Sequence, residues 1–269
     1  MTVNSLRLEQ STVLITGATG GIGRAIAHAL HDRGAAVILT GRRLDVLDEV
    51  AHQLGERCEV VAADLASVQD VGRLAGRTEV DVLVANAALP AAGRLQTFGQ
   101  RELDRALDVN VRAPMQLTLA LLPHMLERGS GHLVYVSSLA GKVASAGSSV
   151  YSATKFAIRG FGYSLSEELR GTGVGVTTVY PGFIRDAGMF HESGTKLPRG
   201  IGTRTPADVA NAVVEGIERN RAEIDVAPFP LSSGAKVFGV SPPVMSRITR
   251  LLGADRVSEQ LETGQRDKR

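Results

Sequence analysis

The sequence contains one cysteine, almost no net charge and no apolar run long enough to cross a bilayer. Cys58 alone cannot form an intrachain disulfide, which excludes a secreted disulfide scaffold and is typical of a cytoplasmic protein. Because 30 Lys and Arg balance 28 Asp and Glu to a formal charge of +2, composition favours no nucleic acid or other charged partner. The first residues also lack the apolar stretch of a signal peptide. We therefore expect a cytoplasmic protein with no membrane-spanning segment.

Internal repeats, low-complexity tracts and interdomain linkers are also absent. A chain of 269 residues with 43% hydrophobic content can bury one large core and lies within the range of a single α/β domain. We expect this domain to cover residues 1–253, including a C-terminal helical segment, with a flexible polar tail over 254–269.

Short apolar runs alternate with stretches whose apolar residues recur at helical spacing. This alternation predicts an α/β fold of the Rossmann type: a doubly wound, mostly parallel sheet of seven strands with helices on both faces. The predicted strands cover residues 12–16, 35–40, 58–63, 80–85, 132–138, 175–180 and 223–227. The clearest predicted helices cover residues 22–33, 43–54, 67–77, 112–127 and 150–170, and one more helix begins after the N-cap Thr205, with Pro206 and Asp208 in its first turn.

A glycine-rich turn, Thr16-Gly-Ala-Thr-Gly-Gly-Ile-Gly23, follows the first predicted strand and leads into a helix. Glycines at 17, 21 and 23 let the chain turn sharply and let backbone N–H groups approach a pyrophosphate, and the helix N-terminus adds partial positive charge. This position suits a dinucleotide, although a glycine-rich turn taken alone also fits a purely structural role.

The end of the second predicted strand indicates which dinucleotide. A carboxylate there would bind the ribose 2′-hydroxyl of NAD, but the chain reads Thr40-Gly41-Arg42-Arg43. The guanidinium of Arg42, helped by Arg43, offers paired donors to a 2′-phosphate, which favours NADP(H). The alternative is a solvated charge at the start of a helix.

The candidate catalytic group lies further along the chain. Ser138 ends a predicted strand, and Tyr151 and Lys155 lie four residues apart on one face of the next helix. A phenol, with a reference pKa of about 10, needs a fall of roughly 3 units to exchange protons readily near neutrality. We expect Lys155 to lower the pKa of Tyr151 in a partly buried site. Taken alone, the same pair is also a common accident of surface helices.

In the order of these motifs the chain resembles the short-chain dehydrogenase/reductase family over residues 11 to about 227. The resemblance implies that Tyr151 is the general acid/base, that Lys155 binds the nicotinamide ribose, that Ser138 orients the carbonyl and that Asn110 holds a proton-relay water. It also implies a homodimer or homotetramer formed through the two helices near 112–127 and 150–170. The cofactor contacts that it implies are those of Gly17, Thr19, Gly21, Ile22, Gly23, Arg42, Arg43, Asp64, Leu65, Asn86, Ala87, Tyr151, Lys155, Pro181, Gly182, Phe183 and Ile184.

The sequence departs from the family pattern at two places. Ala88 stands where the family has a glycine close to the cofactor. Asp186 lies near the position of a threonine that contacts the nicotinamide carboxamide, and its carboxylate either takes that place or turns outward to Arg185 and solvent.

Two apolar segments bear on the substrate and on partners. Residues 183–204 form the predicted substrate lid, whose apolar side chains favour a hydrophobic substrate: Phe183, Met189, Phe190 and Leu197. After Pro242 and Pro243 a short helix is predicted to carry an apolar stripe that packs against the domain or a partner subunit, with contact to a membrane surface as the less favoured alternative: Val244, Met245, Ile248, Leu251 and Leu252.

Three functions remain open from the sequence. The favoured one is an NADP(H)-dependent oxidoreductase that interconverts a carbonyl and an alcohol on a hydrophobic substrate. The alternatives are a 3-oxoacyl thioester reductase and, in another class, a non-catalytic protein that senses NADP(H). No metal site is predicted, because His28 and His31 lack a third ligand and His191 is expected on the surface; Cys58 is expected to be a small core residue.

Overall fold

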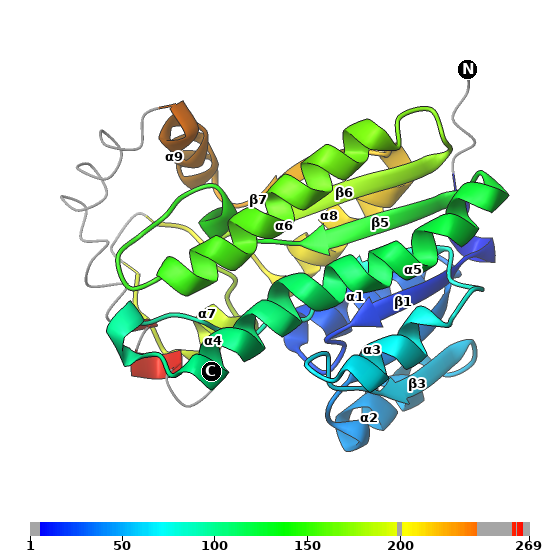
Figure 1. The fold of residues 1–269 in the computed structure, drawn as a ribbon, viewed down its shortest axis with the longest axis horizontal. Coiled ribbons are helices and arrows are strands. Elements are labelled where there is room, and N and C mark those ends of the chain that lie inside the picture. Colours follow the sequence, from blue (N-terminus) through cyan, green and yellow to red (C-terminus); the bar gives the residue numbers. More distant parts are fainter. Residues whose placement is uncertain (1–5, 198–200, 241–259, 262, 266–269) are drawn as a thin grey trace.

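The computed structural model describes residues 6–197, 201–240, 260, 261 and 263–265. In these residues a single seven-stranded sheet has the order β3-β2-β1-β4-β5-β6-β7, and every neighbouring pair is parallel. Helices cover both faces of the sheet (Figure 1), which confirms the predicted doubly wound fold. The strands are β1 Thr12–Thr16, β2 Ala36–Gly41, β3 Cys58–Ala62, β4 Val82–Ala85, β5 Gly131–Val136, β6 Val174–Pro181 and β7 Glu223–Val226.

The predicted helices form close to their expected positions. The sequence did not predict three helices, α4, α7 and α9, and a π-helical turn over Asp108–Arg112 joins α4 to α5. The helix predicted after Pro242 lies outside the described residues. The bounds are α1 Gly21–His31, α2 Leu44–Leu54, α3 Val68–Ala75, α4 Gln100–Leu107, α5 Ala113–Arg128, α6 Ser149–Glu168, α7 Gly188–Glu192, α8 Pro206–Arg219 and α9 Phe229–Val240.

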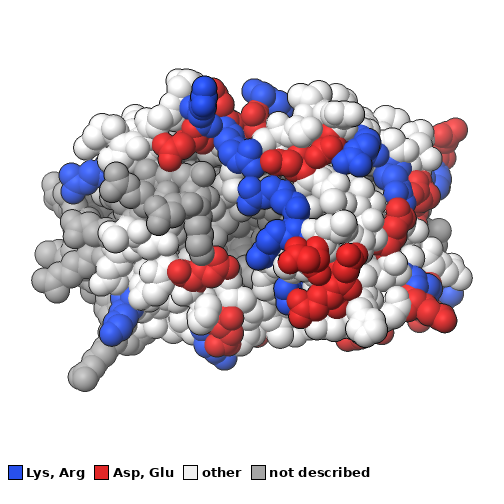
Figure 2. All heavy atoms as spheres, turned by 90° about the horizontal axis from the view of Figure 1, so that it is seen from below, with Lys and Arg blue, Asp and Glu red and all other residues white. Residues whose placement is uncertain are grey.

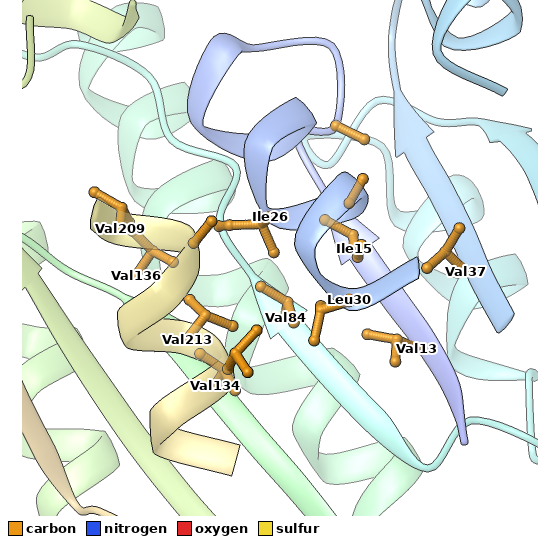
Figure 3. Packing of buried hydrophobic residues seen from close by; sticks show 14 of the residues in the cluster. Val13, Ile15, Ile26, Leu30, Val37, Val84, Val134, Val136, Val209 and Val213 are labelled. Carbon is orange, nitrogen blue, oxygen red and sulfur yellow. The ribbon is translucent and has the colours of Figure 1, made fainter. Parts of the chain in front are cut away.

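Two hydrophobic layers join the sheet to its helices. On one face, α1 and α8 pack against the central strands through fully buried side chains, among them Ile26, Leu30 and Val213 (Figure 3). On the other face, α3, α5 and α6 cover a second cluster that includes Leu14, Leu83 and Tyr135. Strand side chains alternate between the two clusters, because successive residues of a strand point to opposite faces. The sheet is thereby buried on both sides, as its continuous apolar runs predict.

The strand order places the candidate cofactor-binding and catalytic residues at one edge. Because every strand is parallel, the carboxyl ends of the strands meet there, and the order reverses between β1 and β4. The chain leaves β1 for α1 on one face and leaves β4 for helices on the other, so the loops diverge at this point. Ligands of doubly wound sheets bind at such a point, and we call the region between the two loops the crevice.

The two ends of the predicted lid, residues 183–204, are hydrogen-bonded to each other. Ile184 and Arg204 form a parallel bridge; the N–H of Arg204 donates to Phe183 O at 2.9 Å and that of Arg185 to Arg204 O at 2.8 Å. The predicted N-cap follows at once, since Thr205 Oγ1 accepts from the N–H of Asp208 at 3.1 Å. The base of the lid is therefore fixed to the start of α8.

Among the described helices, none has the length and apolar character that crossing a bilayer requires.

One buried histidine makes the stability of the fold depend on pH. His132 on β5 is 2% exposed, and its Nε2 lies 2.8 Å from Thr177 Oγ1. Since the Thr177 hydroxyl donates to Arg221 O at 2.8 Å, it accepts from Nε2–H of His132. Burial lowers the pKa of His132 to about 3.

We expect this histidine to make the protein less stable in mild acid. The unfolded imidazole binds a proton near pH 6.5, whereas the folded one stays neutral down to about pH 3, so stability falls as pH falls through this window. Between pH 7.5 and 5.5 the loss is about 1.4 kcal/mol in the free energy of unfolding by urea. His132→Gln should lack this part of the loss, and an equal loss in the variant would contradict the assignment.

Candidate active site

The glycine turn lies at the start of the crevice, between β1 and α1. Gly17 has a φ of +68°, and a Cβ added there would lie 2.7 Å from Ala87 Cα. A Cβ on Gly23 would lie 2.2 Å from Gly17 O, so both glycines are needed for the turn itself. No side chain caps the N-terminus of α1. The amides of its first turn, which includes Gly21 and Ile22, therefore form a cradle that fits a phosphate.

Thr16, the last residue of β1, fixes this crevice, although the sequence did not single it out as a site residue. Its Oγ1 accepts hydrogen bonds from the N–H groups of Asn86 and Ala87, both at 3.0 Å, and lies 3.4 Å from Val84 O. In the opposite direction, the Nδ2 group of Asn86 donates hydrogen bonds to Thr16 O at 3.0 Å and to Gly17 O at 3.2 Å. The only sequence signal was a hydroxyl directly before the first glycine.

The ends of β2 and β3 bring opposite charges together. Asp64 follows β3, and its Oδ2 accepts from Arg105 of α4 at 2.8 Å, while the exposed Arg42 also acts on it electrostatically. Desolvation acts to raise the pKa of Asp64, but the Ala66 N–H and the two guanidinium groups outweigh it and hold the pKa below its usual value. The predicted contacts Arg42 and Asp64 are therefore neighbours, and Arg105 was not predicted.

Two further predicted contacts complete this end of the crevice. Arg43 donates to Thr19 O at 3.3 Å, so its guanidinium lies over the glycine turn. Leu65 is buried under the β3 exit. Across the face seen in Figure 2, Lys and Arg side chains form a band that ends beside a group of Asp and Glu side chains. This charge pattern is local, in keeping with the small net charge.

Ser138, Tyr151 and Lys155 come together beyond β5, as the spacing predicts. Ser138 follows the strand, and its hydroxyl is hydrogen-bonded to the hydroxyl of Tyr151. Tyr151, in the first turns of α6, is partly buried beside Ala91 and Ala106. Lys155 is 4% exposed; its Nζ donates to Val136 O at 3.0 Å and lies 5.6 Å from the centre of the Tyr151 ring.

The electrostatics of this group differ from the expectation. Desolvation raises the pKa of Tyr151 to about 12, against a smaller lowering by the Ser138 hydrogen bond, and it lowers the pKa of Lys155 to about 8. The prediction that Lys155 lowers the pKa of Tyr151 is therefore wrong for the protein without a bound cofactor. The ammonium is directed to a carbonyl of β5 rather than to the phenol oxygen, so desolvation dominates.

Asn110 lies in the π-helical turn and is 2% exposed. Its Oδ1 accepts from Leu89 N–H at 2.7 Å, and its Nδ2 donates to Leu89 O at 3.0 Å and to Thr154 Oγ1 at 3.3 Å. The side chain thus joins the segment after β4 to α6, one residue before Lys155. A π-helical turn of this kind often marks a functional position.

The segment after β6 closes the other side of the crevice. Ser138 Oγ lies 3.4 Å from Pro181 O, and Gly182 N–H donates to Val226 O at 3.0 Å. Ile184 is buried, whereas the rings of Phe183 and Phe190 pack at a centre-to-centre distance of 5.0 Å. The predicted contacts Pro181, Gly182, Phe183 and Ile184 therefore lie along one stretch that leads from Ser138 to the lid.

Of the two predicted orientations of Asp186, the structure has the one in which its carboxylate turns outward to Arg185 and solvent. Its φ is +70°, an uncommon value for a residue with a side chain, and its exposed carboxylate lies 3.5 Å from Arg185 Nε.

The remaining sequence candidates lie away from this edge. In the part of the chain that the structure describes, no three His, Cys, Asp or Glu side chains gather in a way that could hold a metal ion. His31 contacts Glu56 O at 2.8 Å, and His191 is exposed on α7. Cys58 is partly buried against the core, and desolvation raises its pKa to about 11.

A doubly wound sheet with a glycine turn at its first crossover, and a serine, tyrosine and lysine beside the same edge, defines a Rossmann-fold oxidoreductase. The chain belongs to the short-chain dehydrogenase family, because the sequence model described as short chain dehydrogenase matches residues 11–198. This confirms the resemblance drawn from the motifs.

Known proteins of similar sequence and structure agree with this assignment. The ketoacyl reductase HetN of a Nostoc species is 33% identical, over 91% of this chain and 90% of that protein. A short-chain dehydrogenase from Sphingobium yanoikuyae in complex with NADPH is 26% identical with a TM-score of 0.76, covering 88% of this chain and 95% of that one. A 3-ketoacyl-(acyl-carrier-protein) reductase from Brucella melitensis complexed with NADH is 27% identical with a TM-score of 0.72, covering 81% and 97%.

We expect Thr16→Val to destabilise the protein. Valine keeps the shape of the side chain but leaves the N–H groups of Asn86 and Ala87 without their acceptor, which costs about 1–3 kcal/mol in the free energy of unfolding. Urea denaturation measures this loss. Thr16→Ser retains the hydroxyl and serves as the control; if both variants lost the same amount, the hydroxyl would not be the cause.

Proposed function

We propose that the protein is an NADP(H)-dependent oxidoreductase that interconverts a carbonyl and an alcohol on a hydrophobic substrate. The observation that carries the proposal is the Tyr151 hydroxyl, hydrogen-bonded to Ser138 and next to the buried Lys155, at the same edge of the sheet as the uncapped glycine turn. A proton donor and a phosphate cradle thus lie on the two sides of one crevice.

The protonation states support reduction of a carbonyl. Desolvation raises the pKa of Tyr151 to about 12, so the phenol carries the proton that carbonyl reduction consumes. Its use as a general acid requires that the occupied site bring this pKa down toward neutrality. Ser138 holds the phenol oxygen and can orient a carbonyl oxygen beside it. Lys155, placed one helical turn from Tyr151, would bind the nicotinamide ribose, while Asn110 fixes α6 through Thr154. When bound, the nicotinamide supplies or accepts the hydride.

The choice of NADP(H) rests on the residues after β2. Gly41 ends the strand, and the exposed cation of Arg42 stands where an acid would bind the 2′-hydroxyl of NAD. Similar proteins have been solved with NADPH and with NADH, so family membership alone leaves the choice open. A guanidinium offers paired hydrogen bonds to a 2′-phosphate, which favours NADP(H) for this chain.

The lid supports a hydrophobic substrate. Phe183 and Phe190 pack together at the exit of the crevice, directly after the stretch that begins at Pro181 beside Ser138. Met189 adjoins them on α7. Apolar walls with few polar groups bind apolar ligands by removing their surface from water.

A 3-oxoacyl thioester is the second candidate substrate. It is favoured by similarity to a ketoacyl reductase of Nostoc and to the Brucella 3-ketoacyl-(acyl-carrier-protein) reductase. A thioester of this kind carries the ketone and the apolar chain that the same site would accept, so one substrate panel separates the two candidates.

We also propose that the protein forms a homodimer or homotetramer through α5 and α6. Both helices expose large apolar side chains that a subunit contact would cover: Leu119, Leu126, Phe156 and Tyr163.

Tyr151→Phe should abolish turnover while NADPH still binds. Removal of the only proposed proton donor lowers the rate by about 10²-fold or more, whereas the phosphate cradle is unchanged. NADPH oxidation against a panel of hydrophobic ketones, aldehydes and acetoacetyl thioesters measures the rate, and fluorescence titration measures binding. Tyr163→Phe, which removes the hydroxyl of an exposed tyrosine further along α6 but keeps the apolar ring for the proposed subunit contact, is the matched control.

Near-normal rates in Tyr151→Phe would remove this residue from the mechanism. If wild-type protein bound NADPH but turned over no member of the panel, the non-catalytic NADP(H) sensor would be the better description. Turnover restricted to small polar sugars or polyols would contradict the hydrophobic substrate.

Arg42→Ala should weaken the binding of NADPH and leave that of NADH unchanged. Loss of charge-assisted hydrogen bonds to a 2′-phosphate costs about 1.5–3 kcal/mol, or roughly 10- to 100-fold in the dissociation constant. Parallel titrations with the two cofactors measure the difference. Arg33→Ala, which removes an equal charge at the far end of α1, is the control; a wild-type preference for NADH would overturn the assignment.

A further inference from the structure

The described C-terminal residues, 260, 261 and 263–265, lie against the lid, and we name them the C-terminal strap. Gln265 is 6% exposed, and its Nε2 donates to Met189 O at 3.1 Å. A Cβ added to Gly264 would lie 2.3 Å from Ser193 O, so the strap backbone packs directly on the backbone at the end of α7. Gln260 Oε1 accepts from the N–H of Lys196 at 3.0 Å. Sequence analysis predicted only a flexible polar tail for residues 254–269.

On its inner side, the lid rests on the glycine turn. A Cβ added to Gly21 would lie 2.2 Å from Ala187 Cβ, and one added to Gly188 would lie 3.3 Å from Ile22 Cδ1. The start of α7 therefore contacts the turn that forms the phosphate cradle. Three layers follow one another outward: the glycine turn, α7 and the strap, which is drawn in red beside α7 in Figure 1.

The helix α7 has little support of its own. It spans only the five residues Gly188–Glu192, which is far below the length at which a helix is stable alone. The base of the lid is fixed by the bridge between Ile184 and Arg204, but that bridge lies several residues away from α7. The hydrogen bonds of the strap act on Met189 within the helix and on Lys196, four residues after the helix ends.

We propose that Gln265 is a positioning residue. With Gly264 it holds α7 on the glycine turn and thereby slows the release of the bound dinucleotide. The part of this inference that concerns release rests on the proposed NADP(H) function. The part that concerns the position of α7 is a property of the protein without any ligand.

Two variants loosen the strap in different ways. Gln265→Glu keeps the size of the side chain but replaces the Nε2 donor by a carboxylate oxygen that cannot donate to Met189 O. Gly264→Ala places a methyl group against Ser193 O and pushes the strap away from the lid. Gly72→Ala, on α3 where an added Cβ meets nothing within 4 Å, is the matched control for the second variant.

Two measurements report on the variants. Hydrogen exchange of the peptide that spans 187–197, followed by mass spectrometry in free protein, should be about fivefold faster, because loss of one hydrogen bond is worth about 1 kcal/mol. Stopped-flow release of NADPH should accelerate by a similar factor. The rate of the hydride step in a single turnover should stay unchanged, because neither residue touches the reacting groups.

The possible outcomes test the role of the strap independently of the proposed NADP(H) function. Unchanged exchange of the 187–197 peptide in both variants, with circular dichroism showing an intact fold, would overturn the role of Gln265. Faster exchange with unchanged NADPH release would overturn the link between α7 and the cofactor. If wild-type protein failed to bind NADPH, the proposed function would be lost, and the exchange data would still decide whether the strap positions α7.

Discussion

The site depends on one set of hydrogen bonds, made where the chain leaves β1 and β4 toward opposite faces of the sheet. Divergence opens the crevice, and the Thr16 hydroxyl and the Asn86 carboxamide hold its two walls at a fixed separation. The glycine turn can then pack against Ala87 without a Cβ in the way. Without these hydrogen bonds, the proposed phosphate site at the glycine turn and the proposed proton donor Tyr151 beyond β5 would not be held at a fixed separation.

On the other side of the crevice, burial sets the protonation of Tyr151 and Lys155. Desolvation keeps the Tyr151 proton in place and destabilises the charged form of Lys155, whose ammonium is satisfied by a backbone carbonyl of β5. The loop that carries Ser138 is fastened further along by Lys142, which is buried and bonded to Asp225 of β7 at 2.7 Å. A buried charge that is paired in this way resists displacement, because either partner alone would be costly to bury.

The sequence was sufficient to predict the sheet and the place of most candidate site residues at its carboxyl edge, because each depends on local pattern. Apolar runs such as residues 12–16 specify buried strands, and Thr205 with Asp208 specifies the start of α8. The pKa shift of Tyr151 was predicted with the wrong sign, since desolvation depends on tertiary packing. Arg105 and Gln265 were missed for the same reason: each acts on a partner 41 or 76 residues away in the chain.

The bridge between Ile184 and Arg204 has an evolutionary consequence. Because both ends of the loop are hydrogen-bonded to each other at the end of β6 and the start of α8, the sheet is insulated from changes in the intervening residues, apart from those such as Ala187 and Gly188 that contact the glycine turn. On the proposed function, in which this segment covers the substrate, substrate range can therefore diverge by exchange of residues within the segment while the sheet beneath it is unchanged.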